Sequence, residues 1–247
     1  MNPQKAITAK NLTKTFGDFV AVNKISFEVS EGEIFGFLGA NGAGKTTAMR
    51  MLCGLLHPSS GEGHVAGFDI FRQAQKIKEN IGYMSQRFSL YDDLTTFENM
   101  RLFGGIYGMS NSEIKSRADY WFSELSLKNE RNLLTKSLPL GIKQKVAFSV
   151  ATFHHPKIVF LDEPTGGVDP IARRTFWELI YKAADEGMTV FVTTHYMDEA
   201  EYCHRISIMV DGEIHALDTP QNLKKALSAE NIYDVFIKLA REAERGE

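Results

Sequence analysis

The sequence predicts an α/β fold with a mainly parallel sheet, and two observations support this prediction. Short apolar segments of strand character alternate with longer segments of helical spacing, which is typical of a parallel sheet covered by helices on both faces. A glycine-rich loop at residues 39–47, GANGAGKTT, also follows one of the apolar segments directly. With 247 residues, 43% of them hydrophobic, the chain is long enough to bury one large core or two modest ones.

The first part of the chain contains three predicted strands, at residues 6–9, 25–29 and 34–38. The second of them has apolar residues at alternate positions, as expected for a strand with one buried face. After the glycine loop, apolar residues at helical spacing predict a helix over residues 46–56, which Pro58 would halt. Strand, glycine loop and helix are thus expected in the order that phosphate binding requires.

The middle of the chain changes to a helical pattern. Apolar residues follow helical spacing between residues 87 and 152, and we expect an inserted helical subdomain there. Alternation then resumes with a strand at residues 158–161, a helix at residues 170–185 and a strand at residues 189–193. We therefore expect one domain over residues 1–239.

The end of the chain carries two local signals. Asp169 and Pro170 supply an N-cap and a first-turn proline for the helix that they precede. Within residues 205–217, Asp211 and Gly212 stand between two apolar runs and predict a hairpin turn. Residues 240–247 are charged, and we expect this tail to be frayed from about Leu239 onward.

Composition excludes several classes of protein. The net charge of −3 gives no basic face, so we expect no nucleic-acid partner. The two cysteines, Cys53 and Cys203, have no partners at disulfide or zinc spacing and are interpreted as buried thiols. No apolar stretch approaches the roughly 20 residues that a bilayer span requires, and the N-terminus lacks the apolar region of a secretory signal. A membrane role would therefore need another protein as anchor.

The glycine-rich loop matches the phosphate-binding loop (P-loop) pattern, two glycines separated by four residues and followed by lysine and threonine. In such loops the backbone N–H groups and the helix N-terminus hold the phosphates. The lysine reaches the outer phosphates, and the following threonine can ligate Mg²⁺. The alternative is a glycine-rich turn with a chance lysine. The predicted phosphate-binding residues are Gly39, Ala40, Asn41, Gly42, Ala43, Gly44, Lys45, Thr46 and Thr47.

A second motif, IVFLDEP at residues 158–164, is an apolar strand that ends in two carboxylates. Asp162 is placed to hold Mg²⁺ through water, and Glu163 to activate an attacking water. Solvated acids at a strand end are the alternative interpretation. The presence of the phosphate-binding loop in the same chain favours the catalytic one.

Two further groups of polar residues have ordinary interpretations. His154 and His155 stand at a predicted helix end, where a favourable interaction with the helix dipole is expected and metal binding is the lesser alternative. The acidic cluster Asp198, Glu199 and Glu201 is expected to be a solvated helix face.

The motifs together resemble the nucleotide-binding subunit of ATP-binding cassette (ABC) transporters, over residues 7–239. Phe16 in KTFG looks like the aromatic residue that stacks on adenine, although alone it reads as a core residue. Gln86 in GYMSQ looks like the glutamine that touches Mg²⁺ and reports to the membrane subunits. Asp169 in GGVD looks like part of the loop that contacts the opposite protomer. His195 in TTH resembles the switch histidine that contacts the γ-phosphate, whereas a lone histidine ending a strand is usually just hydrogen-bonded.

One motif departs from the family. The signature Leu-Ser-Gly-Gly-Gln aligns with residues 138–142, in which Pro139 replaces the serine and only Gly141 remains of the paired glycines. Proline has neither a hydroxyl nor a backbone N–H, so the signature is expected to be weakened. Proline is nevertheless well tolerated in the first turn of a helix, and the N–H groups near Gly141 can still face an anion. The segment LPLGIKQK is similar to the degenerate signature of one branch of the ABC-2-type exporters.

The resemblance implies a fold, an activity and partners. The fold is a P-loop NTPase (RecA-like) core with an N-terminal antiparallel β subdomain and the inserted helical subdomain. The activity is hydrolysis of ATP with Mg²⁺, with Lys45, Glu163 and His195 as catalytic residues and Thr46, Gln86 and Asp162 at the metal. The partners are polytopic transmembrane permease subunits at the cytoplasmic face of the inner membrane and a second ABC ATPase subunit, with self-pairing favoured.

Two alternatives stay open at this point. A soluble ABC ATPase acting on ribosomes or DNA would carry the same motifs, although the single cassette and the mildly acidic balance count against it. A small-molecule kinase with the same loop would leave Gln86, His195 and the segment at residues 166–169 unexplained.

Overall fold

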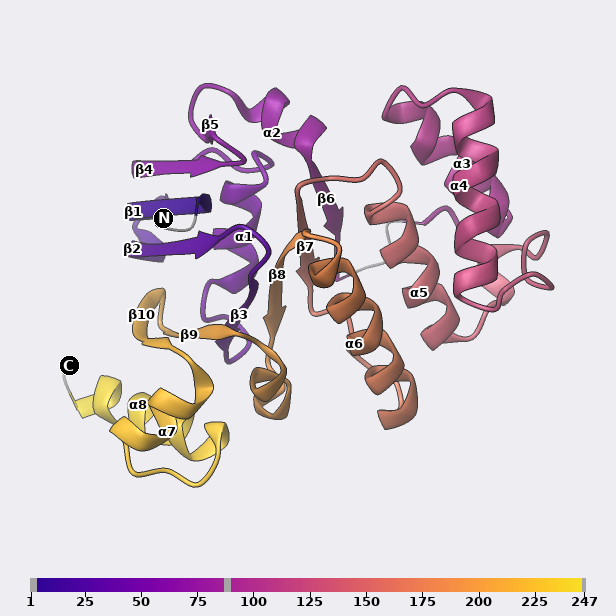
Figure 1. Ribbon diagram of the computed structural model, residues 1–247. Helices are drawn as coiled ribbons and strands as arrows, with labels where there is room; N and C mark the ends of the chain where they lie inside the picture. The colour runs from indigo at the N-terminus through magenta and orange to yellow at the C-terminus, as the bar shows by residue number, and fades with distance from the viewer. Residues whose placement is uncertain (1–3, 87–89, 246–247) are drawn as a thin grey trace.

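The structure, a computed structural model, describes residues 4–86 and 90–245, and two β-sheets form its centre (Figure 1). The smaller sheet is antiparallel, with the strand order β2-β1-β4-β5. Its two long strands include the two N-terminal strands that the sequence predicts, but each runs for 12 residues. The strands of this sheet are β1 (Lys5–Phe16), β2 (Phe19–Ser30), β4 (Ser60–Val65) and β5 (Phe68–Asp69).

The larger sheet has six strands in the order β10-β9-β3-β8-β7-β6. All neighbouring pairs are parallel except β9 and β10, which form the predicted hairpin around Asp211 and Gly212. Because β3, β8 and β7 are parallel neighbours, the loops that follow them leave the same edge of the sheet. The strands are β3 (Ile34–Gly39), β6 (Ile81–Met84), β7 (Ile158–Asp162), β8 (Thr189–Thr194), β9 (Arg205–Val210) and β10 (Glu213–Asp218).

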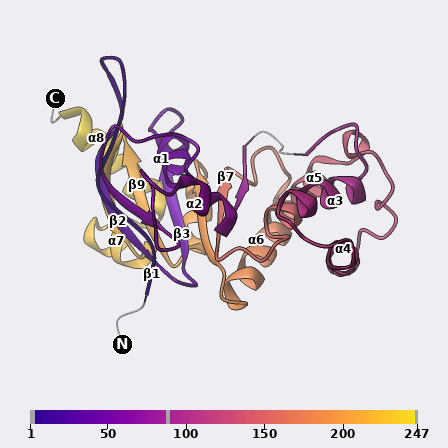
Figure 2. The same cartoon turned by 90° about the horizontal axis from the view of Figure 1, so that it is seen from above.

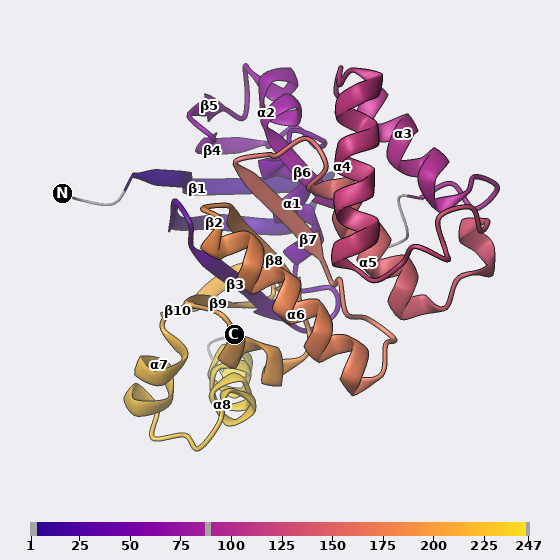
Figure 3. The same ribbon diagram turned by 45° about the vertical axis from the view of Figure 1, so that its right-hand side comes forward.

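Helices cover both faces of the larger sheet. Helix α1 (Lys45–Leu52) lies between the two sheets, and helix α6 (Pro170–Asp185) covers the opposite face (Figures 1 and 3). The alternation of β8 explains both contacts, since Phe191 packs on the side of α1 whereas Val190 and Val192 pack on the side of α6. The expectation of a mainly parallel sheet with helices on both faces is confirmed.

Phenylalanine rings fill the space between the sheets. The ring of Phe191 lies 5.3 Å from the rings of Phe37 and Phe160 and 5.6 Å from that of Phe35, measured between centroids. Phe27 brings the antiparallel sheet into the same cluster at 6.1 Å. These tilted contacts are the favourable arrangement for aromatic pairs, and they fix the strand that ends in the phosphate-binding loop.

A group of helices projects from the sheets (Figure 2). It contains the predicted helical stretches, which begin at Thr96 in the structure; residues 87–89 lie outside the described residues. Trp121 and Phe148 meet edge to face, with centroids 6.1 Å apart, and join two of these helices. The bounds predicted for this helical subdomain, residues 87–152, stay a prediction. The helices are α3 (Thr96–Ile106), α4 (Asn111–Glu124), the short 3₁₀ helix η1 (Thr135–Ser137) and α5 (Leu140–Ala151).

Other elements differ from expectation in their bounds. Helix α1 ends at Leu52 rather than near residue 56, because Gly54 adopts a left-handed conformation with φ of 66°. The expectation of a frayed C-terminal tail is wrong as far as Arg245, since α8 (Ile232–Arg245) is helical to that residue and buries Leu239. The remaining elements are α2 (Ala74–Asn80), the 3₁₀ helix η2 (Met197–Tyr202) and α7 (Pro220–Ala226). Among the described residues, no helix has the length and apolarity needed to cross a bilayer.

Candidate functional site

The phosphate-binding loop connects β3 to α1, as its sequence predicts. Gly44 has a φ of 99°, and a Cβ there would lie 2.4 Å from the carbonyl oxygen of Ala21, so only glycine fits. A Cβ at Gly42 would meet nothing within 4 Å, which leaves the outer side of the loop open to a ligand. Lys45 closes the loop, because its Nζ donates to the carbonyl oxygens of Gly39 and Ala40, both at 2.9 Å.

A hollow opens beside this loop. Predicted residues from the loop and from two other segments line it together, which confirms that the sequence motifs meet in space. Phe19 and Ala21 of β2 form its remaining wall. The lining residues are Phe19, Ala21, Asn41, Gly42, Gly44, Lys45, Thr46, Thr47, Gln86 and Glu163.

Asp162 ends β7 in a buried position beside α1. The hydroxyls of Thr46 and Thr193 both donate to its Oδ1, at 3.1 and 2.7 Å. Burial raises the pKa of the Asp162 carboxyl, and the two hydroxyl hydrogen bonds oppose that rise only in part. The protein therefore holds a carboxylate in a place where its negative charge is disfavoured unless a cation joins it.

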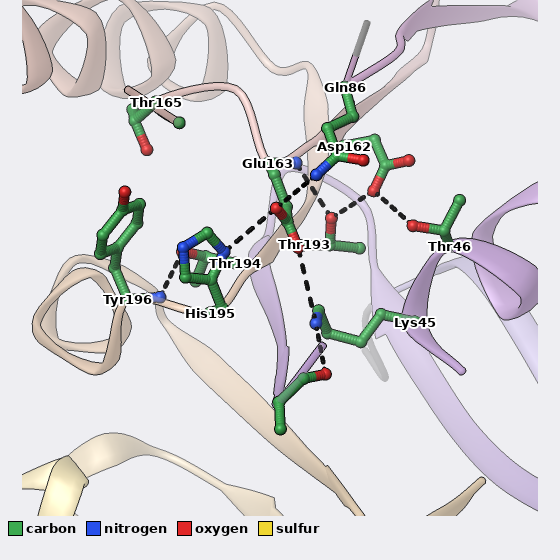
Figure 4. Close-up of polar contacts among 12 residues, drawn as sticks. Lys45, Thr46, Gln86, Asp162, Glu163, Thr165, Thr193, Thr194, His195 and Tyr196 are labelled. Atoms are coloured by element: carbon green, nitrogen blue, oxygen red, sulfur yellow. Dashed lines mark hydrogen bonds and ion pairs between the residues drawn. The ribbon is translucent and has the colours of Figure 1, made fainter. Parts of the chain in front are cut away.

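Glu163 is the meeting point of three segments (Figure 4). Lys45 Nζ lies 3.6 Å from its Oε1, Gln86 Nε2 donates to its Oε2 at 2.8 Å, and His195 Nδ1 lies 3.0 Å from the same Oε2. Its side chain is 8% exposed, and its backbone has a φ of 49°. Burial lowers the pKa of Lys45, while the charges of Glu163 and Asp162 act in the opposite direction.

The structure also shows site residues that the sequence motifs do not indicate. Thr193 donates to Asp162, and its hydroxyl and carbonyl oxygens accept from the backbone N–H of Glu163, each at 3.1 Å. Phe19, 64% exposed, lines the hollow. The predicted aromatic Phe16 pairs with Phe19 across the β1–β2 turn but does not line the hollow, and Lys14 Nζ lies 5.0 Å from its ring centroid. No local sequence pattern indicates Phe19, because residues 19–22 are consecutive apolar residues without alternation.

Gly141 and Asp169 lie apart from the hollow, at the N-terminal ends of α5 and α6. The Asp169 carboxylate caps α6 as predicted, accepting from the N–H groups of Ile171 and Ala172 at 3.0 Å. A Cβ at Gly141 would lie 3.1 Å from that of Ala172, so the two helix starts are in contact. These residues therefore form a separate surface of the same chain.

One ordinary interpretation is wrong for His154, and another is wrong for Glu199 alone. Burial lowers the pKa of His154 to about 4, so its ring is neutral and cannot act as a cation at a helix end. It stacks on Tyr107 with centroids 3.5 Å apart and contacts the carbonyl oxygen of Ile81. In the acidic cluster, Asp198 and Glu201 are exposed, but Glu199 is completely buried. The expectation that both cysteines are buried thiols is confirmed.

Comparison with known proteins identifies the family. Residues 22–166, more than half of the chain, match the family model described as ABC transporter. The chain belongs to the ABC transporter family. Among curated relatives, it is 47% identical over 221 residues to the probable multidrug ABC transporter ATP-binding protein YbhF of Escherichia coli (strain K12), covering 90% of this chain and 38% of YbhF. The chain thus spans well under half of that relative.

In two further comparisons, the alignment covers most of this chain and most of the protein compared with it. The linearmycin resistance ATP-binding protein LnrL of Bacillus subtilis (strain 168) is 35% identical over 238 residues, which is 96% of this ABC chain and 76% of LnrL. A dimeric bacterial ABC transporter cassette of known structure superposes with a TM-score of 0.79 and 29% identity, covering 86% of this chain and 98% of that one. The expected ABC ATPase fold is therefore confirmed.

The residues beside the phosphate-binding loop suit Mg²⁺. A hydroxyl (Thr46), an amide (Gln86) and a carboxylate (Asp162) offer oxygen donors, which Mg²⁺ prefers. Within residues 4–86 and 90–245, no three His, Cys, Asp or Glu side chains are grouped to hold a metal by themselves. A cation here would complete its shell with phosphate oxygens and water, as Mg²⁺ does at nucleotide sites.

The raised pKa of Asp162 predicts a pH-dependent effect on stability. An acid with a folded pKa above its ordinary value of 3.8 binds its proton more tightly when folded, so its contribution to stability is lost as the pH rises through that folded pKa. Asp162→Asn removes the charge and keeps an oxygen for the two hydroxyls. We expect this variant, without nucleotide, to melt at a higher temperature than the wild type at neutral pH, with a smaller difference at acidic pH.

Differential scanning calorimetry at the two pH values measures this difference. Asp18→Asn, at an exposed position in the turn between β1 and β2, is the matched control and should leave the melting temperature unchanged. A lower melting temperature for Asp162→Asn at neutral pH would contradict the prediction.

Proposed function

We propose that the chain hydrolyses ATP as the nucleotide-binding subunit of an ABC exporter, using Lys45, Glu163 and His195 as catalytic residues. One observation supports this proposal above all. Lys45, Gln86 and His195 all contact the carboxylate of Glu163 beside the phosphate-binding loop. Relatives named for multidrug transport, linearmycin resistance and Nod factor export support the exporter assignment.

The geometry supports a division of roles during hydrolysis. The open backbone of the loop binds the phosphates, and Lys45, now held by carbonyl oxygens and Glu163, turns to the outer phosphates. Thr46, Gln86 and Asp162 would hold Mg²⁺. When bound, this ion would neutralise part of the phosphate charge. Glu163 orients the attacking water and accepts its proton, while His195 contacts the γ-phosphate.

Glu163→Gln tests the catalytic role directly. The amide keeps the shape of the side chain but cannot accept a proton, so we expect turnover to fall by a factor of roughly 10²–10⁴. ATP affinity should stay close to that of the wild type, and the variant should elute as a closed dimer with ATP. Steady-state ATPase assays, titration with a fluorescent ATP analogue and gel filtration give the three readouts.

Glu178→Gln on the exposed side of α6 is the control for loss of a negative charge. Near-normal turnover by Glu163→Gln would remove Glu163 from its role. Loss of binding together with turnover would instead indicate damage to the phosphate-binding loop.

The second ABC ATPase subunit is proposed to be another copy of this chain. In such a pair the signature region of one copy would face the phosphate site of the other, and the dimeric cassette of similar structure supports pairing of two cassettes. Pro139 precedes α5, where its carbonyl oxygen accepts from the N–H groups of Ile142 and Lys143 at 3.0 Å. Leu140, 37% exposed, stands where the family has glycine. Both side chains are expected to weaken the approach of a phosphate to the helix N-terminus.

Restoring the signature should therefore strengthen pairing. Pro139→Ser combined with Leu140→Gly adds a hydroxyl donor and removes the bulky side chain. A hydrogen bond to a charged group changes affinity by roughly ten- to a hundredfold, and we expect ATP-driven dimerisation and basal ATPase to rise accordingly. Analytical ultracentrifugation with ATP compares this variant with Pro139→Ala/Leu140→Gly, which lacks the hydroxyl. Equal dimerisation of wild type and both variants would show that the native signature is not weakened.

The permease subunits are proposed to dock on the exposed side of α3. A mostly apolar hollow there is lined by Leu94, Leu102 and Ile106, with Ile106 65% exposed. Tyr91, 57% exposed, lies in the segment that connects Gln86 to this helix, and Phe88 of the same segment lies outside the described residues. An amphipathic helix from a membrane protein fits such a surface. The chain would then sit at the cytoplasmic face of the inner membrane.

A soluble ABC ATPase that acts on ribosomes or DNA is the alternative. The net charge of −3 gives no support to a nucleic-acid surface. Recovery of the chain with a polytopic partner from detergent-solubilised membranes separates the two functions, because the soluble alternative requires no such partner.

A further inference from the structure

Glu199 is a completely buried carboxylate that the roles proposed above do not use. It lies in η2, four residues after His195, and its side chain has no exposed surface. A carboxylate is almost never fully buried unless it is paired, because the free energy lost when the charge leaves water is far larger than the free energy gained by burying the side chain. The hydrogen bonds and ion pair that stabilise the buried Glu199 carboxylate therefore identify the chain segments that it connects.

Each carboxylate oxygen of Glu199 is bound by a different segment. The hydroxyl of Thr165 donates to Oε1 at 2.5 Å, and the hydroxyl of Thr194 donates to Oε2 at 2.7 Å. Both threonines are themselves 1% exposed. Arg173 Nε, from α6, lies 3.5 Å from Oε1 and supplies a compensating positive charge. Both oxygens have polar partners, which is the condition for retaining a buried carboxylate.

The two threonines belong to the two segments that carry the proposed catalytic groups. Thr165 follows Glu163 by two residues and leads into residues 166–169, the loop that the family uses to contact the opposite protomer. Thr194 immediately precedes His195, and its hydroxyl also accepts from the N–H of Tyr196 at 3.0 Å. Glu199 therefore joins these segments through one rigid planar group.

A second set of contacts connects the same residues to the histidine ring. The guanidinium of Arg173 stacks over the ring of Tyr196 at 4.1 Å, and the rings of Tyr196 and His195 lie 4.2 Å apart. Figure 4 shows Thr165 and Tyr196 on the side of His195 that faces away from Lys45. The His195 ring thus has Glu163 on one side and this cluster behind it.

We propose that Glu199 is a positioning residue for ATP hydrolysis, which sets His195 against Glu163 by bridging Thr165 to Thr194. Because of this bridge, a displacement of residues 166–169 also moves His195. Contact with a partner protomer would therefore change the position of His195 at the γ-phosphate site. The inference rests on the catalytic roles proposed above for Glu163 and His195.

The first experiment compares valine and serine at the two threonines. Thr165→Val and Thr194→Val keep the side-chain shape and remove the hydroxyl, whereas Thr165→Ser and Thr194→Ser keep the hydroxyl. We expect each valine variant to lower kcat at least about tenfold, the effect of one lost hydrogen bond to a charged group, while KM for ATP changes little. The serine variants should restore kcat to nearly the wild-type value.

A second readout follows the histidine itself. In protein with ¹⁵N-labelled histidine, the ring nitrogen signals of His195, assigned with His195→Gln, should shift in Thr165→Val and in Glu199→Gln but not in Thr165→Ser. The Thr165→Val/Glu199→Gln double variant should shift these signals and lower kcat no more than the stronger single variant, because both changes break one bridge.

Several results would overturn the proposal. Valine variants with wild-type kcat, additive effects in the double variant, or unchanged His195 signals in Thr165→Val would each show that Glu199 serves folding alone. Failure of the proposed function gives a different result, since Glu163→Gln and His195→Ala would then hydrolyse ATP like the wild type. If a valine variant does not fold, Glu199→Gln provides both kcat and the ring signals.

Discussion

The site depends on one physical constraint, the convergence of three chain segments on the carboxylate of Glu163. The sheet creates the constraint, because the parallel strands β3, β7 and β8 end at one edge and deliver Lys45, Glu163 and His195 to the same place. Gln86 arrives from the segment after β6, the next strand along. Without a nucleotide, the Glu163 carboxylate thus lies among the Lys45 ammonium, the Gln86 amide and the His195 ring.

This arrangement explains why the site suits a triphosphate. Lys45 is 4% exposed and uses carbonyl oxygens and Glu163 as substitutes for an anion. Asp162 and Glu163 place two acidic side chains in succession beside it, and burial raises the pKa of Asp162. On the proposed roles, a phosphate with its cation would satisfy the lysine and the aspartate together, and it would free Glu163 to act on water. Under this proposal, nucleotide binding would be coupled to release of the Glu163 carboxylate.

Much of the fold and of this site could be predicted from sequence, for identifiable reasons. The phosphate-binding loop and the strand ending in Asp162 and Glu163 are local patterns whose geometry follows from a few residues. The bounds of α6 agree with prediction because Asp169 and Pro170 form a strong local start signal. The family resemblance added Gln86 and His195, which no local rule would connect with residues far away in the chain.

The errors have a common physical cause in long-range contacts. Nothing in the acidic cluster at residues 198–201 indicates that Glu199 turns inward, because one of its hydroxyl partners, Thr165, lies 34 residues earlier. The neutral His154 results from burial against Tyr107, and the exposed Phe19 depends on how β2 passes the loop. Such residues are identified by their surroundings, which a short sequence pattern does not contain.

Hydrogen–deuterium exchange of the nucleotide-free protein tests the central claim, that Glu163 holds the surrounding segments together. Glu163→Ala should accelerate exchange in peptides covering residues 39–47 and residues 193–197, and should leave helix α4, residues 111–124, unchanged as an internal control. Unchanged exchange in both segments would contradict the account, because the phosphate-binding loop and the histidine segment would then be held without the carboxylate.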